Sequence, residues 1–275
     1  MRTLRRYRLN NKTEVKFWQG YLSAFEGIDV SIDGAFGPKT VAATKEFQKR
    51  YGLAQDGSCG PMTQAKAGFM KTRNANIVVQ KVPFSKIECA DVLLKDKQAY
   101  NCRRFATEGG YDVVWNGGFF EMKSLRSVQL IMINGEIKTW GMGYEGIAYD
   151  KPFTKAVGGD AMAYTNKPYD MQGGAPILIF NYLQDNESMD IFKYKIPLSA
   201  KRNCTAVSDD ALFLFFSLTS VTSYDMMKEG LNQKVRFMQN NDGGGSQSIY
   251  MGGGYVITTD GRSIPTAVGL KIRRK

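Results

Sequence analysis

Asp33-Gly34-Ala35-Phe36-Gly37-Pro38-Lys39-Thr40 returns downstream as Asp56-Gly57-Ser58-Cys59-Gly60-Pro61-Met62-Thr63, in the shared pattern D-G-x-x-G-P-x-T. Asp-Gly favours a tight turn, and proline after glycine suits the first turn of a helix. Each copy is therefore predicted to be a loop that enters a helix. Apolar residues at helical spacing over residues 15–25 predict a further helix before the first copy. Three short helices are expected at the N-terminal end.

This combination closely resembles the peptidoglycan-binding domain found at the ends of many cell-wall hydrolases. The matching residues are Trp18-Gln19, the first repeat copy, Phe47-Gln48, Gly52-Leu53 and Asp56-Gly57, so the resemblance covers about residues 11 to 70. It implies glycan binding, for which Tyr21, Phe36, Tyr51 and Gln48 are candidate contacts. The Asp-Gly turns are explained equally well as connections between helices.

The rest of the chain has the pattern of a mixed α+β domain. Strand-like runs occur at residues 76–82, 111–115, 128–134, 175–180, 211–218, 248–258 and 266–272, and helical patterns at residues 96–107 and 224–240. The polar stretch 71–76 is interpreted as a linker. The predicted organisation is a three-helix domain at residues 1–70, this linker, and a larger domain with glycine-rich loops at residues 77–275.

The composition restricts the chemistry, because the sequence contains no histidine. This excludes catalysis by Ser-His-Asp or Cys-His groups and zinc sites that rely on imidazole. The four scattered cysteines, at positions 59, 89, 102 and 204, form no C-x-x-C pair and are interpreted as mostly buried thiols. Acid or base catalysis must therefore use Asp, Glu, Tyr, Lys or Cys.

The charge and the N-terminus indicate the surroundings in which the protein works. The net charge of +11 favours an anionic partner, such as nucleic acid, membrane headgroups or a phosphate-bearing wall. Basic residues are dispersed and no nucleic-acid motif is present, so nucleic acid ranks lowest. No apolar run is long enough to span a membrane, and none follows the basic residues 2–8 as a secretory signal would require. Export by the Sec route is not expected.

Two glycine-rich segments, each following a patterned stretch, are the strongest candidates for a catalytic site. Asn241-Asp242-Gly243-Gly244-Gly245-Ser246 places one carboxylate in backbone that a ligand can approach closely. Asn116-Gly117-Gly118-Phe119-Phe120 ends an apolar run in the same way. For Asp242 the alternative is a carboxylate that only caps its own turn.

The order of these segments resembles the phosphodiester glycosidase family over residues 76–273. The resemblance rests on Asn116 to Phe120, Gly173-Gly174-Ala175-Pro176, Arg202 before Ala206-Val207, Asp242 to Ser246, and residues 262–268. It departs from the family at Ser217-Leu218-Thr219, where Asp-Gly-Arg is common, and at Asn241, where Leu is common. These departures indicate that substrate preference has shifted.

The family implies hydrolysis of a glycosyl phosphodiester and suggests a role for each residue. Asp242 would be the nucleophile or would activate water, and Glu121 would be its partner; a solvated loop acid is the alternative for Glu121. Arg202 would bind phosphate oxygens, with a structural ion pair as its alternative. The remaining candidates for substrate binding are Asn116, Gly117, Gly118, Phe119, Gly174, Gly243, Gly244 and Ser246. Asn116 would orient sugar hydroxyls, Phe119 would stack on a ring, and the N–H groups of Gly117, Gly118, Gly243 and Gly244 would bind the anion. A divalent cation beside Asp242 is left open.

Together the two halves predict a cell-wall-degrading glycoside hydrolase. The enzyme would cut a glycosyl phosphodiester of a wall polymer such as teichoic acid, or a glycosidic bond of peptidoglycan. With no export signal, it resembles a bacteriophage endolysin that accumulates in the host cytoplasm and reaches the wall after release. The alternative is a non-enzymatic wall-binding or virion structural protein that retains a glycosidase fold.

Overall fold

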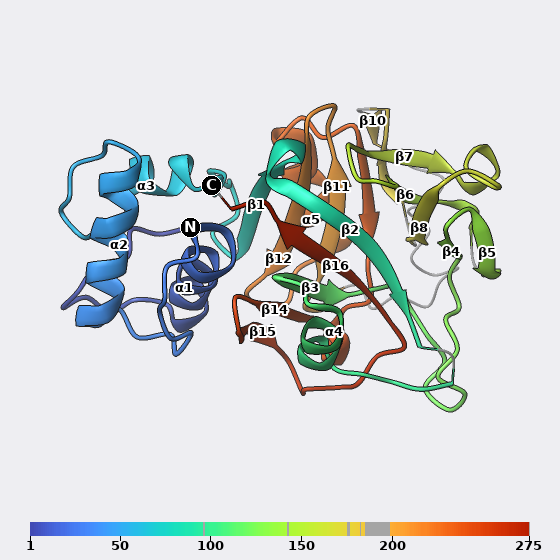
Figure 1. Ribbon diagram of the computed structural model, residues 1–275, viewed down its shortest axis with the longest axis horizontal. Helices are drawn as coiled ribbons and strands as arrows, with labels where there is room; N and C mark the ends of the chain where they lie inside the picture. The colour runs from blue at the N-terminus through green and yellow to red at the C-terminus, as the bar shows by residue number, and fades with distance from the viewer. Residues whose placement is uncertain (96, 142, 175–176, 182, 185–198, 275) are drawn as a thin grey trace.

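The computed structural model describes residues 1–95, 97–141, 143–174, 177–181, 183–184 and 199–274. It contains a small helical region followed by a larger region rich in antiparallel sheets, as the α+β prediction requires (Figure 1). Within the described residues, no helix is both long and apolar enough to cross a membrane.

The helical region, residues 1–70, consists of α1 (Lys12–Glu26), α2 (Pro38–Arg50) and α3 (Pro61–Lys66). Asn11 caps α1 by accepting hydrogen bonds from the N–H groups of Thr13 and Glu14. Pro38 and Pro61 begin the other two helices, as the repeated Gly-Pro predicts.

Each repeat copy is fixed by one buried glutamine. Gln48 Nε2 donates to Asp56 Oδ1 at 2.7 Å and to the Ser58 carbonyl at 3.0 Å, while its Oε1 accepts from Gly57 N at 2.9 Å. Gln19 makes the equivalent contacts with Asp33, Ala35 and Gly34. The Asp-Gly turns are therefore structural connections whose carboxylates already have partners.

Replacing Gln48 with Ala is expected to reduce the free energy of unfolding by about 2 kcal/mol or more, because buried turn groups lose their partner. Urea denaturation followed by far-UV circular dichroism measures the change. Gln55→Ala, at an exposed position in the same connection, is the control and should shift stability by less than about 0.5 kcal/mol. Equal effects of the two substitutions would contradict the structural role of Gln48.

The larger region contains three sheets, in which every described strand pairing is antiparallel. The six-stranded sheet has the order β1 (Ile77–Pro83), β12 (Ala211–Ser217), β11 (Asn203–Val207), β13 (Phe237–Asn240), β9 (Ile177–Phe180), β10 (Leu183–Gln184). The second sheet has the order β15 (Gly254–Thr258), β14 (Ser248–Met251), β3 (Val113–Asn116), β16 (Thr266–Ile272), β2 (Ile87–Leu94). The third, far from the helical region in Figure 1, has the order β5 (Glu136–Thr139), β4 (Ile131–Ile133), β8 (Tyr169–Gly173), β6 (Glu145–Asp150), β7 (Ala156–Asp160). Among the described residues, 3-10 helices cover Phe84–Lys86, Ala161–Ala163 and Gly244–Ser246.

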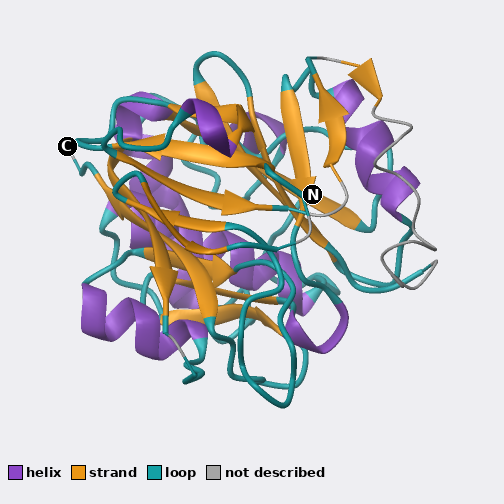
Figure 2. Ribbon diagram, turned by 90° about the vertical axis from the view of Figure 1, so that its right-hand side faces the viewer, coloured by secondary structure: helices purple, strands orange, loops and turns teal. Residues whose placement is uncertain are grey.

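The strands lie centrally and helices flank them (Figure 2). α5 (Ser223–Asn232) packs against β9 and β13, where its Met226 joins Ile179 and Met238 in one apolar cluster. α4 (Cys102–Gly109) covers the second sheet at β3, β14 and β16. The main core lies between the sheets and continues into the helical region.

The helical region is packed directly on the sheets. The Phe17 and Phe216 rings lie 5.8 Å apart, and Ser23 Oγ donates to the Gly252 carbonyl at 2.7 Å. At Gly20 a Cβ would lie 2.9 Å from Val256, so α1 approaches the β14–β15 hairpin closely. Residues 71–76, interpreted as a linker, lie against α5: the Arg73 N–H donates to Glu229 Oε2 at 3.0 Å.

Several predicted elements differ from the structure. Residues 248–258 form a hairpin and not one strand, because Gly252 and Gly253 adopt positive φ and turn the chain. The helix predicted over 224–240 ends at Asn232, and β13 follows after Lys234, whose φ is 55°. The helix predicted at 96–107 begins at Cys102, after its Asn101 cap. Only Ile131–Ile133 of the run 128–134 is a strand, while residues 175–176 of the run 175–180 lie outside the described residues.

Candidate active site

The Asp242 loop, residues 241–247, connects β13 of the six-stranded sheet to β14 of the second sheet. Three backbone hydrogen bonds fix it: Asp242 N donates to the Gly117 carbonyl at 3.0 Å, Asn241 N to Asn203 at 3.0 Å, and Gly244 N to Lys201 at 2.8 Å. The two predicted glycine-rich segments therefore meet where the sheets adjoin, beside the start of β11.

Asn116 holds this junction together from a fully buried position. Its Nδ2 donates to the Asp242 carbonyl at 2.7 Å, and its Oδ1 accepts from Ser248 N at 3.0 Å and Asn203 Nδ2 at 2.9 Å. Both polar atoms are engaged within the protein. Asn116 was predicted to orient sugar hydroxyls, but this geometry makes it a support for the loop that carries Asp242.

Asp242 is half-buried, and its burial raises the pKa of the carboxyl group to about 6. The Ser246 hydroxyl, the Gly243 N–H group and the Arg262 charge act in the opposite direction. A carboxyl group with this pKa exchanges protons near neutral pH. It can therefore serve as a base without histidine.

The charged side chain that acts on Asp242 is Arg262, which the sequence analysis did not select as a site residue. Its Nη2 pairs with Asp260 Oδ2 at 3.1 Å, and both groups lie against Gly245, where a Cβ would be 2.6 Å from Nη2. Its Nη1 approaches Met122 Sδ at 3.6 Å. The guanidinium is therefore exposed between the Asp242 loop and the turn that follows Phe120.

Arg202 lies beneath the loop with only 2% of its surface exposed. Its Nε donates to the Val221 carbonyl at 3.1 Å, and its backbone N–H donates to Ser217 Oγ at 2.7 Å. Burial lowers the pKa of the guanidinium. The Nε contact directs this part of the side chain towards the segment before α5. The role of Arg202 in binding phosphate beside Asp242 stays a prediction.

Glu121 is exposed in a turn, where its carboxylate accepts a hydrogen bond from Ser124 Oγ. No described contact joins Glu121 to Asp242, although the neighbouring Met122 approaches Arg262. This placement agrees with the alternative of a solvated loop acid.

The predicted anion-binding glycines serve mainly close packing. Gly117 N donates to the Thr266 carbonyl at 2.9 Å and Gly244 N to Lys201, so these two N–H groups already have acceptors. A Cβ on Gly243 would lie 2.4 Å from the Lys201 carbonyl oxygen. A Cβ on Gly118 would overlap Gln129 Oε1, which accepts from Phe119 N at 3.0 Å. Phe119 itself is half-buried, and Ser246 is buried.

Three buried glutamines that no sequence pattern distinguished lie around Gly173 and Gly174, and we refer to them as the amide cluster: Gln129, Gln172 and Gln239. Gly173 N donates to the Leu130 carbonyl at 2.8 Å, which brings Gln129 beside Gly174, and the Gln239 side chain contacts Gly174. Gln172 directly precedes Gly173 in strand β8. Ala175 and Pro176 of the predicted Gly-Gly-Ala-Pro segment lie outside the described residues.

The amide cluster contains polar atoms without hydrogen bonds. Within the part of the chain that the structure describes, Gln129 Nε2, both polar atoms of Gln172, and Gln239 Oε1 have no hydrogen-bond partner. Buried polar groups in proteins are almost always paired, so this concentration of unpaired amides is unusual. Amide donors and acceptors of this kind suit sugar hydroxyl and N-acetyl groups.

Thiol chemistry at Cys102 and Cys204 and a metal site are not supported by the described part of the chain. Burial raises the pKa of the Cys102 and Cys204 thiols to about 12, which suppresses thiolate formation. The described residues contain no group of three or more Cys, Asp or Glu placed to hold a metal ion, so the cation left open beside Asp242 has no described ligand set.

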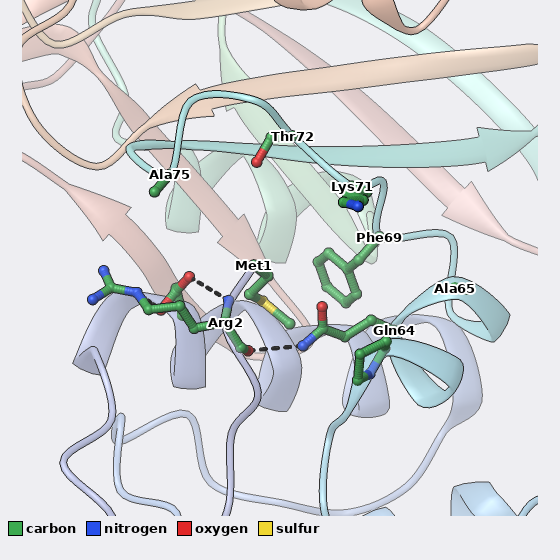
Figure 3. Close-up of a pocket in the computed structure, with 10 residues that line it drawn as sticks. Met1, Arg2, Gln64, Ala65, Phe69, Lys71, Thr72 and Ala75 are labelled. Carbon is green, nitrogen blue, oxygen red and sulfur yellow. Dashed lines mark hydrogen bonds and ion pairs between the residues drawn. The ribbon is translucent and has the colours of Figure 1, made fainter.

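The helical region has a pocket of its own, at its border with residues 71–75 (Figure 3). Met1 and Phe69 give it apolar walls, while the Arg2 N–H donates to Glu14 and the Arg2 carbonyl accepts from Gln64 Nε2 at 2.8 Å. By contrast, the candidate contacts Tyr21 and Phe36 are buried in the core.

Residues 11–66 match a protein family described as "Putative peptidoglycan binding domain". The chain is 57% identical over 37 residues to the zinc D-Ala-D-Ala carboxypeptidase of Streptomyces albus G. That match covers 14% of this chain and 14% of the relative, so it concerns a small part of each protein.

Two solved structures resemble most of the chain. One is the zebrafish N-acetylglucosamine-1-phosphodiester alpha-N-acetylglucosaminidase catalytic domain auto-inhibited by its pro-peptide, with a TM-score of 0.57 and 14% identity over 74% of this chain and 86% of that one. The other is a hypothetical protein from Synechocystis, with a TM-score of 0.58 and 10% identity over 74% of this chain and 61% of that one. At these identities the similarity establishes the fold alone.

Proposed function

We propose that this protein is a cell-wall hydrolase in which the helical region binds peptidoglycan and the Asp242 site cleaves a glycosyl phosphodiester of a wall polymer. The observation that carries the proposal is Asp242 itself, a carboxyl group with a raised pKa on a braced glycine loop. The match to the peptidoglycan-binding family supports the wall as the location of the substrate.

The chemistry requires a carboxylate at the anomeric carbon and a positive charge at the phosphate. Ionised Asp242 attacks the anomeric carbon, or deprotonates a water molecule that attacks it, and the C–O bond to phosphate breaks. In the first route, water then hydrolyses the ester between the sugar and Asp242, which restores the carboxylate. The phosphate leaves as a phosphomonoester, and the hydroxyl group of water remains on the sugar. We assign charge neutralisation to Arg262 in place of Arg202, because Arg262 is exposed and acts on Asp242.

The unpaired amides of Gln129, Gln172 and Gln239 support a sugar as the reacting group. The zebrafish enzyme with a similar fold is named for removal of an N-acetylglucosamine unit from a phosphodiester. We further propose that the protein is an endolysin-like enzyme, which accumulates in the host cytoplasm and then acts on the wall. This part of the proposal rests on the combination of the two regions.

The proposal is tested by incubating isolated bacterial walls with purified protein, with and without prior removal of phosphate-linked polymers. Mass spectrometry should detect phosphomonoester-ended fragments only while those polymers are present. Reducing-end muropeptides would instead place the cut in the peptidoglycan strand. Wall sedimentation without any released fragment, over several wall types, would favour the alternative of a non-enzymatic binding protein.

The pH dependence of hydrolysis should follow the carboxyl group of Asp242. Its pKa is raised to about 6, so below that pH the group is protonated and inactive as a base or nucleophile. We expect kcat/KM to rise through about pH 6 and to level off above it. In Arg262→Gln the charge that lowers this pKa is absent, so the midpoint should move to higher pH. A rate that falls as pH rises through 6 would contradict this assignment.

A further inference from the structure

A second pocket lies at the junction of the two regions, with a volume of about 280 Å³. We refer to it as the junction pocket. Lys12 and Lys16, from the first turns of α1, and Asp33 form its helical side, while Lys201, Gln247 and Thr258 belong to the α+β side. Neither region forms this pocket alone.

The charge of the junction pocket is positive. Lys12, Lys16 and Lys201 make no ion pair in the part of the chain that the structure describes. The single carboxylate, Asp33, accepts hydrogen bonds from Gln19 Nε2 and from Ala35 N, both at 2.8 Å. Three lysines therefore line the pocket together with one carboxylate that is already engaged in its turn.

The junction pocket borders the backbone of the catalytic loop. The carbonyl of Lys201 accepts from Gly244 N at 2.8 Å. Gln247, the last residue of the Asp242 loop, donates through Nε2 to Arg202 and Ser217 carbonyls at 2.7 and 3.1 Å. Its Oε1 is buried and has no hydrogen-bond partner among the described residues. Among the described residues, the pocket thus combines three lysines that form no ion pair with an acceptor that has no hydrogen bond, next to the proposed reaction site.

The two sides of the junction pocket are fixed relative to each other by direct contacts. Ser23 Oγ donates to the Gly252 carbonyl, and Gly20 allows α1 to approach Val256 closely. In Figure 1, α1 lies between α2 and the sheets, and it packs against the β14–β15 hairpin. A ligand can therefore contact both regions without any rearrangement between them.

We infer that the junction pocket is an additional subsite that binds a phosphate group of the wall polymer beside the site of cleavage. Ammonium groups bind phosphate as point charges, and the unused acceptor of Gln247 suits a hydroxyl group of the polymer backbone. The pocket shown in Figure 3 is less suited to an anion, because Arg2 there pairs with Glu14. This inference rests on the proposed function for the identity of the polymer.

The test uses the full chain with Asp242→Asn, which removes hydrolysis, and a glycerol-phosphate oligomer as the probe in isothermal titration calorimetry. Lys12→Gln, Lys16→Gln and Lys201→Gln combined should weaken binding about tenfold or more at moderate salt. The control combines Lys39→Gln, Lys49→Gln and Lys155→Gln, which removes the same charge at exposed positions elsewhere, and should change binding less than about twofold.

Equal weakening by the two triple variants would overturn the junction pocket as a site. Poly-glutamate that binds as tightly as the oligomer would overturn the assignment to phosphate. Hydrolysis is measured separately in proteins that retain Asp242. Lysine-dependent binding without any hydrolysis would leave the junction pocket in place and refute the proposed function, while hydrolysis without lysine-dependent binding would do the reverse.

Discussion

Asp242→Asn is expected to lower hydrolysis of wall polymer by about a thousandfold or more while the protein stays folded. The amide has nearly the shape of the carboxyl group but cannot act as a nucleophile or base. The backbone contacts of residue 242 with Gly117 and Asn116 do not involve the carboxylate, so they remain. Initial rates of phosphomonoester release measure the loss.

The same substitution should also stabilise the protein at neutral pH. The pKa of Asp242 is raised to about 6 in the folded state, so the folded protein binds a proton more tightly than the unfolded chain. Stability is therefore lost as pH rises from the unfolded pKa through about 6, and Asn removes this loss. A gain of about 1–3 kcal/mol at pH 7, absent at low pH, is expected in urea denaturation.

Glu121→Gln is the matched control, because Glu121 is the other carboxylate predicted at the site and is exposed. It should keep activity within about tenfold of the original and leave stability unchanged. If Glu121→Gln abolished hydrolysis and Asp242→Asn did not, the roles of the two carboxylates would have to be exchanged.

Gly243→Ala is expected to reduce activity by about a hundredfold or more and to destabilise the protein by about 2 kcal/mol. The φ of Gly243 is −116°, which any residue can adopt, so the cost comes from space alone. An added Cβ would lie 2.4 Å from the backbone oxygen of Lys201. That oxygen accepts the hydrogen bond from Gly244 N that fixes the loop. Asp242 would therefore be displaced from its position.

The neighbouring Gly244 provides the control, because there the backbone conformation favours glycine and space does not limit the side chain. Its φ is +57°, and an added Cβ would meet no atom within 4 Å. Asparagine tolerates this left-handed conformation, so Gly244→Asn should retain most of the activity. Steady-state kinetics and urea denaturation of both variants test this explanation of the loop geometry. A larger loss of activity and stability in Gly244→Asn than in Gly243→Ala would contradict it.

The sequence allowed prediction of the features that depend on local chemistry. The paired D-G-x-x-G-P-x-T stretches enter helices at Pro38 and Pro61, and the glycine segments at 117 and 243 do meet in space. Turns and helix starts are determined by neighbouring residues, which explains this success. The α+β class followed from the same patterns.

The features that escaped prediction depend on contacts between distant segments. The apolar pattern at Val235 and Met238 continues that of α5, but pairing with β11 and β9 makes residues 237–240 a strand. The importance of Arg262 arises from how its loop folds beside Gly245. Arg202 has the sequence context of a phosphate ligand, yet it is buried beneath the loop. In the sequence, nothing distinguishes three glutamines from surface residues, and they are buried only because the sheets pack around them: Gln129, Gln172 and Gln239.

The central claim is that Asp242 directs cleavage of the bond between the anomeric carbon and the phosphate oxygen. Hydrolysis of a glycerol-phosphate wall polymer that carries a glycosyl phosphodiester, performed in water labelled with oxygen-18 and analysed by mass spectrometry, tests it most directly. We predict that the released phosphomonoester contains no label, because the oxygen of water is added to the sugar, and that Asp242→Asn releases none. Label in the phosphate would show cleavage of the P–O bond and would contradict the account.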